Sequence, residues 1–293
     1  MSAGAEPVGF IGLGNIGAPM ATRLLDWPGG LVVHDVRAEA TEPFVAEGAT
    51  AAASPAELAS RASVVCIVVQ DEDQVRGVLE GPDGILAGAS PGTVVAVHST
   101  ISAEGAEALG ELASGAGVEL LDAPVSGGAA GAHSGTLAVM LGGSEAAVQR
   151  ATPVLERFAT MVQHMGPVGA GTRTKITRNL LTFASFAVAG EAQRLAEAAG
   201  LDLGKLGEVV RHSDKVTGGP GAIMIRPTAT PMAEDDGLRP IFAHSAELGA
   251  KDLELARRMA AELGVAAPFA ELAQRWLPSA LGLVEPPEGG DAP

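Results

Sequence analysis

The feature that most constrains this chain is the alternation, over its first half, of short apolar runs with amphipathic stretches. The runs are rich in valine and isoleucine and cover residues 8–11, 31–33, 64–69, 94–97 and 118–121. Nearly continuous apolar strands of this kind are typical of a parallel sheet that is buried on both faces. The helical stretches between them predict βαβ units, so we expect a Rossmann-type α/β fold.

The pattern changes after about residue 166. Residues 174–199 contain no proline and one interior glycine, Gly190, which predicts a single long helix. Further helices are expected over residues 201–212, 246–263 and 267–283, with a loop rich in glycine and proline over 214–240. We therefore predict a parallel-sheet domain over residues 1–166, an all-α domain over 167–284 joined by the long helix, and a disordered tail over 285–293.

A glycine-rich loop follows the first expected strand directly and precedes a helix. Its sequence matches the G-x-G-x-x-G pattern of dinucleotide-binding folds. In that pattern Gly12 permits the tight turn, Gly14 lets the backbone approach a pyrophosphate, and Gly17 lets helix and strand pack closely. We predict that the loop contacts the dinucleotide through Gly12, Gly14, Asn15, Ile16 and Gly17. The alternative is a tight turn that holds no ligand.

The cofactor is expected to be NAD, with NADP possible. Asp35 ends the second expected strand, where a carboxylate accepts hydrogen bonds from the ribose hydroxyls of NAD and repels the 2′-phosphate of NADP. Arg37 lies two residues further on and offers a positive charge to that phosphate. The choice between the two cofactors therefore stays open at this point.

Composition and charge exclude several classes of function. The net charge of −16 and an aromatic content of 3% without tyrosine disfavour nucleic-acid binding. The longest aliphatic run, 64–69, is far shorter than the roughly 18 residues of a membrane-spanning helix. The histidines lack paired metal-ligand spacing, so we expect no metal. The single cysteine, Cys66, and the absence of a signal-like start favour a reduced, cytoplasmic location.

Four ordered segments carry a resemblance to a known family. They are residues 9–17 with Pro19-Met20-Ala21, residues 122–128 with Gly131-Ala132 and Gly135-Thr136-Leu137, Gly169-Ala170-Gly171 with Lys175 and Asn179, and Lys251-Asp252-Leu253. Together they resemble the β-hydroxyacid dehydrogenases, which include 3-hydroxyisobutyrate dehydrogenases and tartronate semialdehyde reductases. The resemblance covers almost the whole chain.

The resemblance implies hydride transfer between a short 3-hydroxy acid and the nicotinamide. The hydroxyl proton needs a base, and the resemblance assigns Lys175 to that role. Free lysine has a pKa of about 10.4, which burial and a cationic nicotinamide would lower. Asn179 follows four residues later, on the same face of a helix, where its amide can orient the hydroxyl.

The same resemblance implies further contacts. The backbone of Ser126, Gly127 and Gly128 forms a nest for a substrate carboxylate. Thr100 lies beside the nicotinamide, and Lys251 reaches the active site or cofactor from the second domain. The alternatives are a plain turn at residues 126–128 and a surface lysine beside Asp252.

Three features depart from the family pattern. His98 stands where a small or hydroxyl residue is expected, and is either a substrate contact or a loop histidine, with the loop favoured. Arg178 precedes Asn179 where many members carry a second asparagine, and residues 70–73 are unusually acidic. The best guess for the substrate is 3-hydroxyisobutyrate. An NADP-dependent reductase of tartronate semialdehyde or another short semialdehyde is the alternative.

Two rival functions share this fold. Imine reductases usually replace the catalytic lysine, so Lys175 argues against that activity. A non-catalytic dinucleotide-binding module is disfavoured because Lys175 and Asn179 are both present. The long helix carries apolar residues on more than one face around residues 180–189, which predicts burial against a second subunit in a homodimer or homotetramer.

Overall fold

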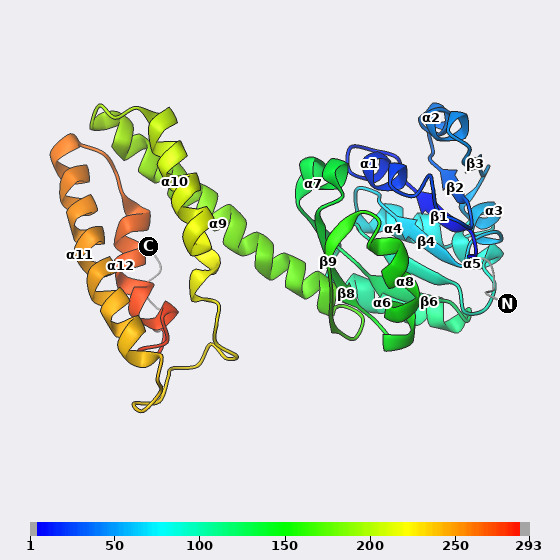
Figure 1. Cartoon of the computed structure of the whole chain (residues 1–293). Helices are drawn as coiled ribbons and strands as arrows, with labels where there is room; N and C mark the ends of the chain where they lie inside the picture. The colour runs from blue at the N-terminus through cyan, green and yellow to red at the C-terminus, as the bar shows by residue number, and fades with distance from the viewer. Residues whose placement is uncertain (1–4, 288–293) are drawn as a thin grey trace. The chain divides into compact units, whose positions relative to one another are not determined.

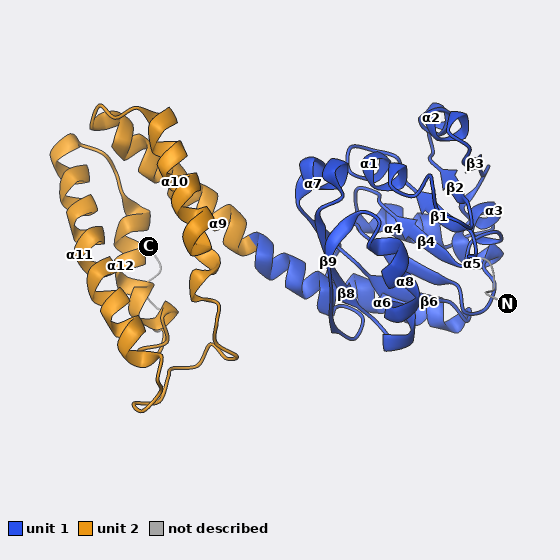
Figure 2. Ribbon diagram, viewed as in Figure 1, with its two compact units in different colours: residues 1–179 blue, residues 180–293 orange. Residues whose placement is uncertain are grey.

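The computed structural model describes residues 5–287. The chain divides into two compact units, residues 1–179 and 180–293 (Figure 2). The sequence places the domain boundary between residues 166 and 167, where the last strand ends. The compact units divide later, inside helix α9 (Ala170–Ala198), because the first turn of that helix packs on the sheet of the first unit.

The described part of the first unit contains nine strands in one sheet (Figure 1). They are β1 (Val8–Ile11), β2 (Leu31–His34), β3 (Thr50–Ala51), β4 (Val64–Ile67), β5 (Val94–Val97), β6 (Glu119–Asp122), β7 (Val125–Ser126), β8 (Leu137–Gly142) and β9 (Ala159–Gly166). Their order is β3-β2-β1-β4-β5-β6-β8-β7, with β9 also paired to β8.

The strands from β3 to β6 are all parallel, which confirms the predicted Rossmann-type sheet. Beyond them β8 runs antiparallel to both β6 and β7, and β9 runs parallel to β8. This antiparallel edge is not among the elements predicted from the sequence.

Helices cover both faces of the sheet. They are α1 (Gly17–Thr22), η1 (Ala38–Thr41), α2 (Glu42–Ala46), α3 (Pro55–Ala59), α4 (Glu72–Leu79), α5 (Ile85–Gly88), α6 (Ala103–Gly115), α7 (Gly128–Ser134) and α8 (Glu145–Leu155). Local side chains start several of them: Ser54, Asp71, Ser102 and Ser144 each accept a hydrogen bond from the first helical turn.

Alternation along the buried strands builds two cores. In β4, Val64 and Cys66 pack with helices α1 and α8, whereas Val65 and Ile67 pack with α3 to α6. All four residues of β4 are buried, as the continuous apolar run predicts for a strand that is covered on both faces. The two cores hold the carboxyl ends of β1, β2, β4 and β5 at one edge of the sheet.

The described residues of the second unit form helices and connecting segments without a strand, as predicted. After the end of α9 it contains α10 (Leu203–Thr217), η2 (Gly219–Ile223), α11 (Arg239–Leu263) and α12 (Pro268–Ala280). Helix α11 begins earlier than expected because Pro240 occupies its first turn, where a proline is tolerated. Residues 285–287 have no regular structure, and the rest of the predicted tail, 288–293, lies outside the described residues.

Candidate active site

A pocket of about 900 Å³ opens at the carboxyl ends of β1, β2 and β4. Its lining includes the glycine loop and the end of β2 on one side, and α3 and α4 on the other: Ile11, Gly12, Gly14, Asn15, His34, Asp35, Val36, Arg37, Pro55, Val68, Val69, Gln70, Gln74, Gly77 and Val78. The order of the strands reverses between β1 and β4, which is where open α/β sheets bind their ligands. The pocket therefore lies where the sequence predicts a dinucleotide.

The three glycines of the loop are needed for different reasons. A Cβ atom on Gly12 would lie 2.1 Å from the carbonyl oxygen of Val68, and its φ of +93° favours glycine. A Cβ on Gly17 would lie 1.9 Å from the oxygen of Gly12. A Cβ on Gly14 would meet no protein atom within 4 Å. The fold itself thus requires Gly12 and Gly17, whereas the open space at Gly14 fits a ligand that approaches the backbone.

Asp35 joins the glycine loop to the end of β2. Its carboxylate accepts hydrogen bonds from the backbone N–H of Leu13 (2.7 Å) and from that of Arg37 (2.9 Å). Burial alone would raise the pKa of Asp35, but the hydrogen bonds from Arg37 and Leu13 and the Arg37 charge bring it below the ordinary value. The carboxylate is therefore ionised at neutral pH and keeps acceptor sites for ribose hydroxyls. The Arg37 guanidinium lies 3.4 Å from it and is 60% exposed.

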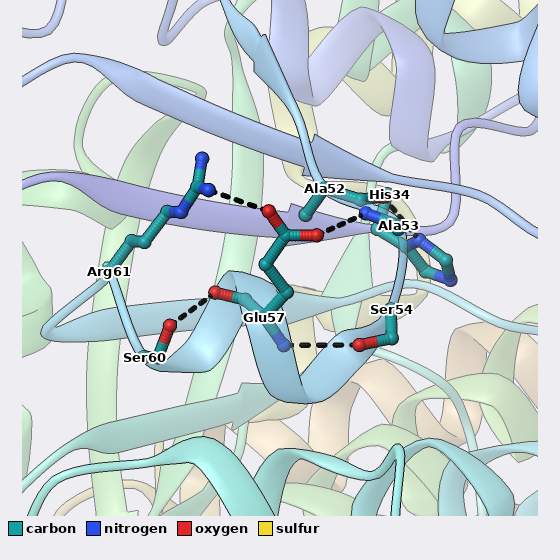
Figure 3. Close-up of polar contacts among 7 residues, drawn as sticks. All are labelled: His34, Ala52, Ala53, Ser54, Glu57, Ser60 and Arg61. Atoms are coloured by element: carbon teal, nitrogen blue, oxygen red, sulfur yellow. Dashed lines mark hydrogen bonds and ion pairs between the residues drawn. The ribbon is translucent and has the colours of Figure 1, made fainter.

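A network below the pocket fixes His34, a residue that the sequence analysis did not single out (Figure 3). Its Nδ1 lies 2.9 Å from the carbonyl oxygen of Ala52. The adjacent residue, Ala53, donates its N–H to the carboxylate of Glu57, which also pairs with Arg61 at 2.6 Å. The imidazole is thus held as part of the pocket wall by the segment that leads into α3.

Ser99 and His98 follow β5 and are both buried. The Ser99 hydroxyl donates to the carbonyl of Val69 (2.7 Å) and accepts from its N–H (3.0 Å), which clamps a pocket-lining residue. His98 turns into the core, where its ring packs edge-on against Phe158 and its Nδ1 lies 2.7 Å from the Ala123 oxygen. Burial lowers the pKa of His98 to about 4, so the imidazole is neutral at physiological pH. Thr100, the next residue, is exposed.

The acidic residues within the segment 70–73, at the start of α4, have a structural role. Asp71 caps α4 by accepting from the N–H of Gln74 (2.9 Å). Glu72 accepts from the hydroxyl of Ser102 (2.7 Å), which ties α4 to the start of α6. Negative charge in the first turn of a helix is also favoured by the helix dipole.

The segment Ser126–Gly128 joins β7 to α7. Ser126 is partly buried, and both glycines are exposed with φ values of +130° (Gly127) and +61° (Gly128). A Cβ on Gly128 would meet no protein atom within 4 Å. A Cβ on Gly127 would lie 3.0 Å from Cδ2 of Leu137, so the backbone is open at Gly128, where the predicted carboxylate nest requires free space.

Lys175 and Asn179 lie one turn apart on α9 within the first unit, and both are partly buried. Burial, and secondarily the charge of Arg178, lowers the pKa of the Lys175 amine. The amine makes no hydrogen bond or ion pair with any residue in 5–287. Arg178 is exposed, but its charge still favours the neutral, basic form of Lys175.

Asp122, at the end of β6, is the polar residue at this edge whose role the sequence analysis missed. It is 1% exposed and accepts hydrogen bonds from the N–H groups of Gly169 (2.8 Å) and Thr172 (2.6 Å) at the start of α9. Burial raises its pKa, although these two bonds oppose the shift. The sequence signal that could have identified Asp122 is its position at the end of a strand, as the first residue of the 122–128 motif.

Lys251 lies in the second unit, on α11. Its ammonium group is 3.2 Å from the Asp252 carboxylate, and both side chains are exposed. The glycine loop and Asp35 thus line one pocket, Ser126–Gly128, Lys175 and Asn179 belong to the same unit, and Lys251 belongs to the second unit.

Within residues 5–287, no group of three or more histidine, cysteine, aspartate or glutamate side chains is arranged to hold a metal ion. Within the same residues, no helix is long and apolar enough to cross a membrane.

Comparison with known proteins identifies the family. Residues 7–166 match the NAD-binding domain of 6-phosphogluconate dehydrogenase, and residues 169–287 match the NAD-binding domain of NADP-dependent 3-hydroxyisobutyrate dehydrogenase. The chain belongs to the β-hydroxyacid dehydrogenase family. It is therefore an oxidoreductase with an NAD(P)-binding domain, from a family that acts on the CH–OH group of small hydroxy acids.

Similar family members support this placement. An uncharacterized oxidoreductase of Mycobacterium tuberculosis is 53% identical over 95% of this chain and 94% of its own length. A solved oxidoreductase structure from Mycobacterium avium 104 is 47% identical, covers 95% of this chain and 99% of that one, and has a TM-score of 0.90. An NAD-dependent L-serine dehydrogenase of Pseudomonas aeruginosa is 38% identical over 92% of this chain and 90% of its own length.

The glycine geometry predicts opposite effects for two matched substitutions. Gly14→Ala should leave the thermal unfolding midpoint nearly unchanged and weaken NAD binding about tenfold or more, because a methyl group would occupy the ligand's space. Gly17→Ala should destabilise the fold by about 1–3 kcal/mol, because its Cβ collides with backbone. Thermal unfolding and NADH fluorescence titration measure both. Unchanged NAD affinity in Gly14→Ala would place the dinucleotide elsewhere.

Proposed function

We propose that this protein is an NAD-dependent dehydrogenase of a short 3-hydroxy acid, with 3-hydroxyisobutyrate as the first candidate. The observation that carries the proposal is the Lys175 amine, which is partly buried, has a lowered pKa and has no partner within residues 5–287. An unpaired amine of this kind is what a general base requires.

In the proposed reaction the Lys175 amine accepts the proton of the substrate hydroxyl while hydride leaves the carbon that bears this hydroxyl. Bound NAD supplies the hydride acceptor. In the reverse direction the Lys175 ammonium returns the proton to the oxygen. Asn179, on the same face of α9, orients the hydroxyl without adding a charge that would compete with the amine.

The residues of the pocket fit a dinucleotide. The open space at Gly14 admits a pyrophosphate beside the loop of Gly12 to Gly17, including Asn15 and Ile16, and Asp35 offers an ionised carboxylate to the ribose. We assign Thr100 to the nicotinamide end and Lys251 to a contact made from the second unit. Asp35 favours NAD, and exposed Arg37 is the residue through which NADP would be accepted.

Ser126, Gly127 and Gly128 are proposed to bind the substrate carboxylate through backbone N–H groups and the serine hydroxyl. 3-Hydroxyisobutyrate and L-serine, the substrate named for the Pseudomonas aeruginosa relative, share a hydroxymethyl group next to the carbon that bears the carboxylate. Both compounds therefore present a hydroxyl group and a carboxylate with the same spacing to the proposed active site.

Cys66 takes no part in this chemistry. It is fully buried in β4, and burial raises its pKa to about 12, so the thiol stays protonated. A cytoplasmic location remains part of the proposal.

A steady-state screen tests the proposed function. It measures kcat/KM for 3-hydroxyisobutyrate, L-serine and 4-hydroxybutyrate with NAD and NADP, and for tartronate semialdehyde with NADH and NADPH. We expect the highest value for 3-hydroxyisobutyrate with NAD. Binding of NAD without turnover of any of these compounds would favour a non-catalytic binding module.

Lys175→Ala is expected to lower kcat by about 100- to 10,000-fold, the usual contribution of a general base. The NAD dissociation constant should stay unchanged, since Lys175 lies outside the pocket of the glycine loop. In the wild type, hydroxy-acid oxidation should rise with pH as the amine loses its proton.

Arg178→Ala is the matched control for this assignment. Removing its charge should raise the pKa of Lys175 and move the rising limb of the pH profile to higher pH. Near-normal turnover of Lys175→Ala, or a limb that stays in place in Arg178→Ala, would remove the assignment of the base.

Asp35→Asn is expected to shift cofactor preference. Wild-type kcat/KM should be higher with NAD than with NADP. The ratio of the two values should fall by about 10- to 100-fold in the variant, because the repulsion of the 2′-phosphate is removed. Arg37→Ala should instead lower activity with NADP. A wild-type preference for NADP would show that Arg37, not Asp35, sets the specificity.

We also propose a homodimer or homotetramer. Apolar side chains of α9 in the second unit are solvent-exposed in the single chain, at 71% for Leu180, 62% for Phe183 and 65% for Phe186. Light scattering should give two or four times the 29.3 kDa chain mass, and Phe186→Asp should reduce it. A wild-type monomer at micromolar concentration would contradict this proposal.

A further inference from the structure

A buried carboxylate connects two parts of the proposed active site. Asp122 ends β6, and both of its oxygens accept backbone hydrogen bonds: Oδ1 from Gly169 at 2.8 Å and Oδ2 from Thr172 at 2.6 Å. These donors lie 47 and 50 residues away along the chain. The side chain therefore acts as the cap of a distant helix, α9, which it anchors to the sheet.

Two glycines make room for this contact. A Cβ on Gly142, which is paired with Asp122 across β6 and β8, would lie 2.1 Å from Oδ1. A Cβ on Gly171, in the first turn of α9, would lie 2.3 Å from the backbone carbonyl oxygen of Met140 and 2.6 Å from that of Asp122. The backbone of α9 thus lies directly against the ends of β6 and β8, with no side chain between them.

The chain leads from Asp122 to the proposed substrate loop, and from its hydrogen-bond partner to the proposed base. Three residues after Asp122 the backbone enters β7, which ends at Ser126. On α9, Lys175 follows Thr172 by about one helical turn. One carboxylate is therefore the common anchor of the segment expected to hold the substrate carboxylate and of the helix expected to present the amine.

We propose that Asp122 is a positioning residue for catalysis, which fixes the first turn of α9 and thereby sets the place of the Lys175 amine relative to the Ser126–Gly128 loop. The inference rests on the proposed function. Asp122 acts through the backbone and does not pair with the amine. A misplacement of about 1 Å at a reacting group can cost about 100-fold in rate, so small shifts of this turn matter.

The same turn has a second tether, which serves as a control. Arg173 pairs with Glu107 of α6 at 2.8 Å, and both side chains are about half exposed. Exposed ion pairs contribute little to holding a structure in place. The buried pair of backbone hydrogen bonds to Asp122 should therefore fix the turn, and the Arg173–Glu107 pair should not.

Asp122→Asn tests the inference because asparagine keeps the shape but has one carbonyl oxygen in place of two acceptors. We expect kcat to fall by about 100-fold, the NAD dissociation constant to stay within about twofold, and the pH profile that reports Lys175 to shift. Glu107→Gln should leave all three unchanged. Gly142→Ala retains the aspartate but crowds its Oδ1, so this variant should reproduce the pattern of Asp122→Asn.

The outcomes separate this inference from the function on which it rests. If Lys175→Ala is active, the proposed function fails. If Lys175→Ala is inactive while Asp122→Asn keeps the wild-type kcat and pH profile, the positioning role alone is wrong. If Asp122→Asn and Gly142→Ala both lose NAD binding together with turnover, the carboxylate supports the fold and does not place the amine, which also overturns the inference.

Discussion

Buried carboxylates that accept hydrogen bonds from backbone N–H groups are the interaction on which the rest of this structure depends. The first N–H groups of a helix have no partner inside it, and when the helix start is buried they must be satisfied from elsewhere. Asp122 does this for α9, and Glu191 of α9 does it for α12 by accepting from Phe269 (2.9 Å) and Ala270 (2.8 Å). Asp35 supports the glycine loop in the same way through Leu13. Asp122 and Asp35 thus fix turns of the proposed site, and Glu191 fixes the start of a helix in the second unit.

This arrangement explains how one edge of a sheet can serve both cofactor and substrate. The parallel strands bring the glycine loop, Asp35 and the clamp of Ser99 on Val69 to their carboxyl ends. Further along the same sheet, β6 ends in Asp122 and is followed by Gly127 and Gly128, both of which have positive φ values. The chemistry we propose needs these parts to be rigid relative to one another, and the described contacts provide that rigidity because short side chains bond directly to backbone groups.

Much of the fold could be predicted from the sequence because the relevant signals are local. Continuous apolar runs predict strands that are buried on both faces, and the glycine loop with Asp35 predicts the switch-point pocket. The proline-free stretch from Thr174 predicts α9 closely. The antiparallel edge was missed because β7 has two residues, and because the apolar run of β8, although it indicates a buried strand, does not show in which direction that strand pairs.

The part of the site that the sequence could not show depends on contacts between distant residues. Asp122 stands in a recognisable motif, but its partners lie 47 and 50 residues away, and nothing in local spacing connects them. For His98 the sequence allows a substrate contact or a loop position and favours the loop. His98 is a buried neutral imidazole packed against Phe158, because its side chain turns toward the core at the end of β5.

The most direct test of the central claim is to follow the hydrogen that leaves the substrate. 3-Hydroxyisobutyrate in which both hydrogens of the hydroxymethyl carbon are replaced by deuterium is oxidised with NAD, and the reduced cofactor is analysed by mass spectrometry. Our account predicts one deuterium in each NADH formed and slower turnover than with the unlabelled acid. Reduced cofactor that lacks deuterium, or no oxidation of the acid by a protein that binds NAD, would contradict it.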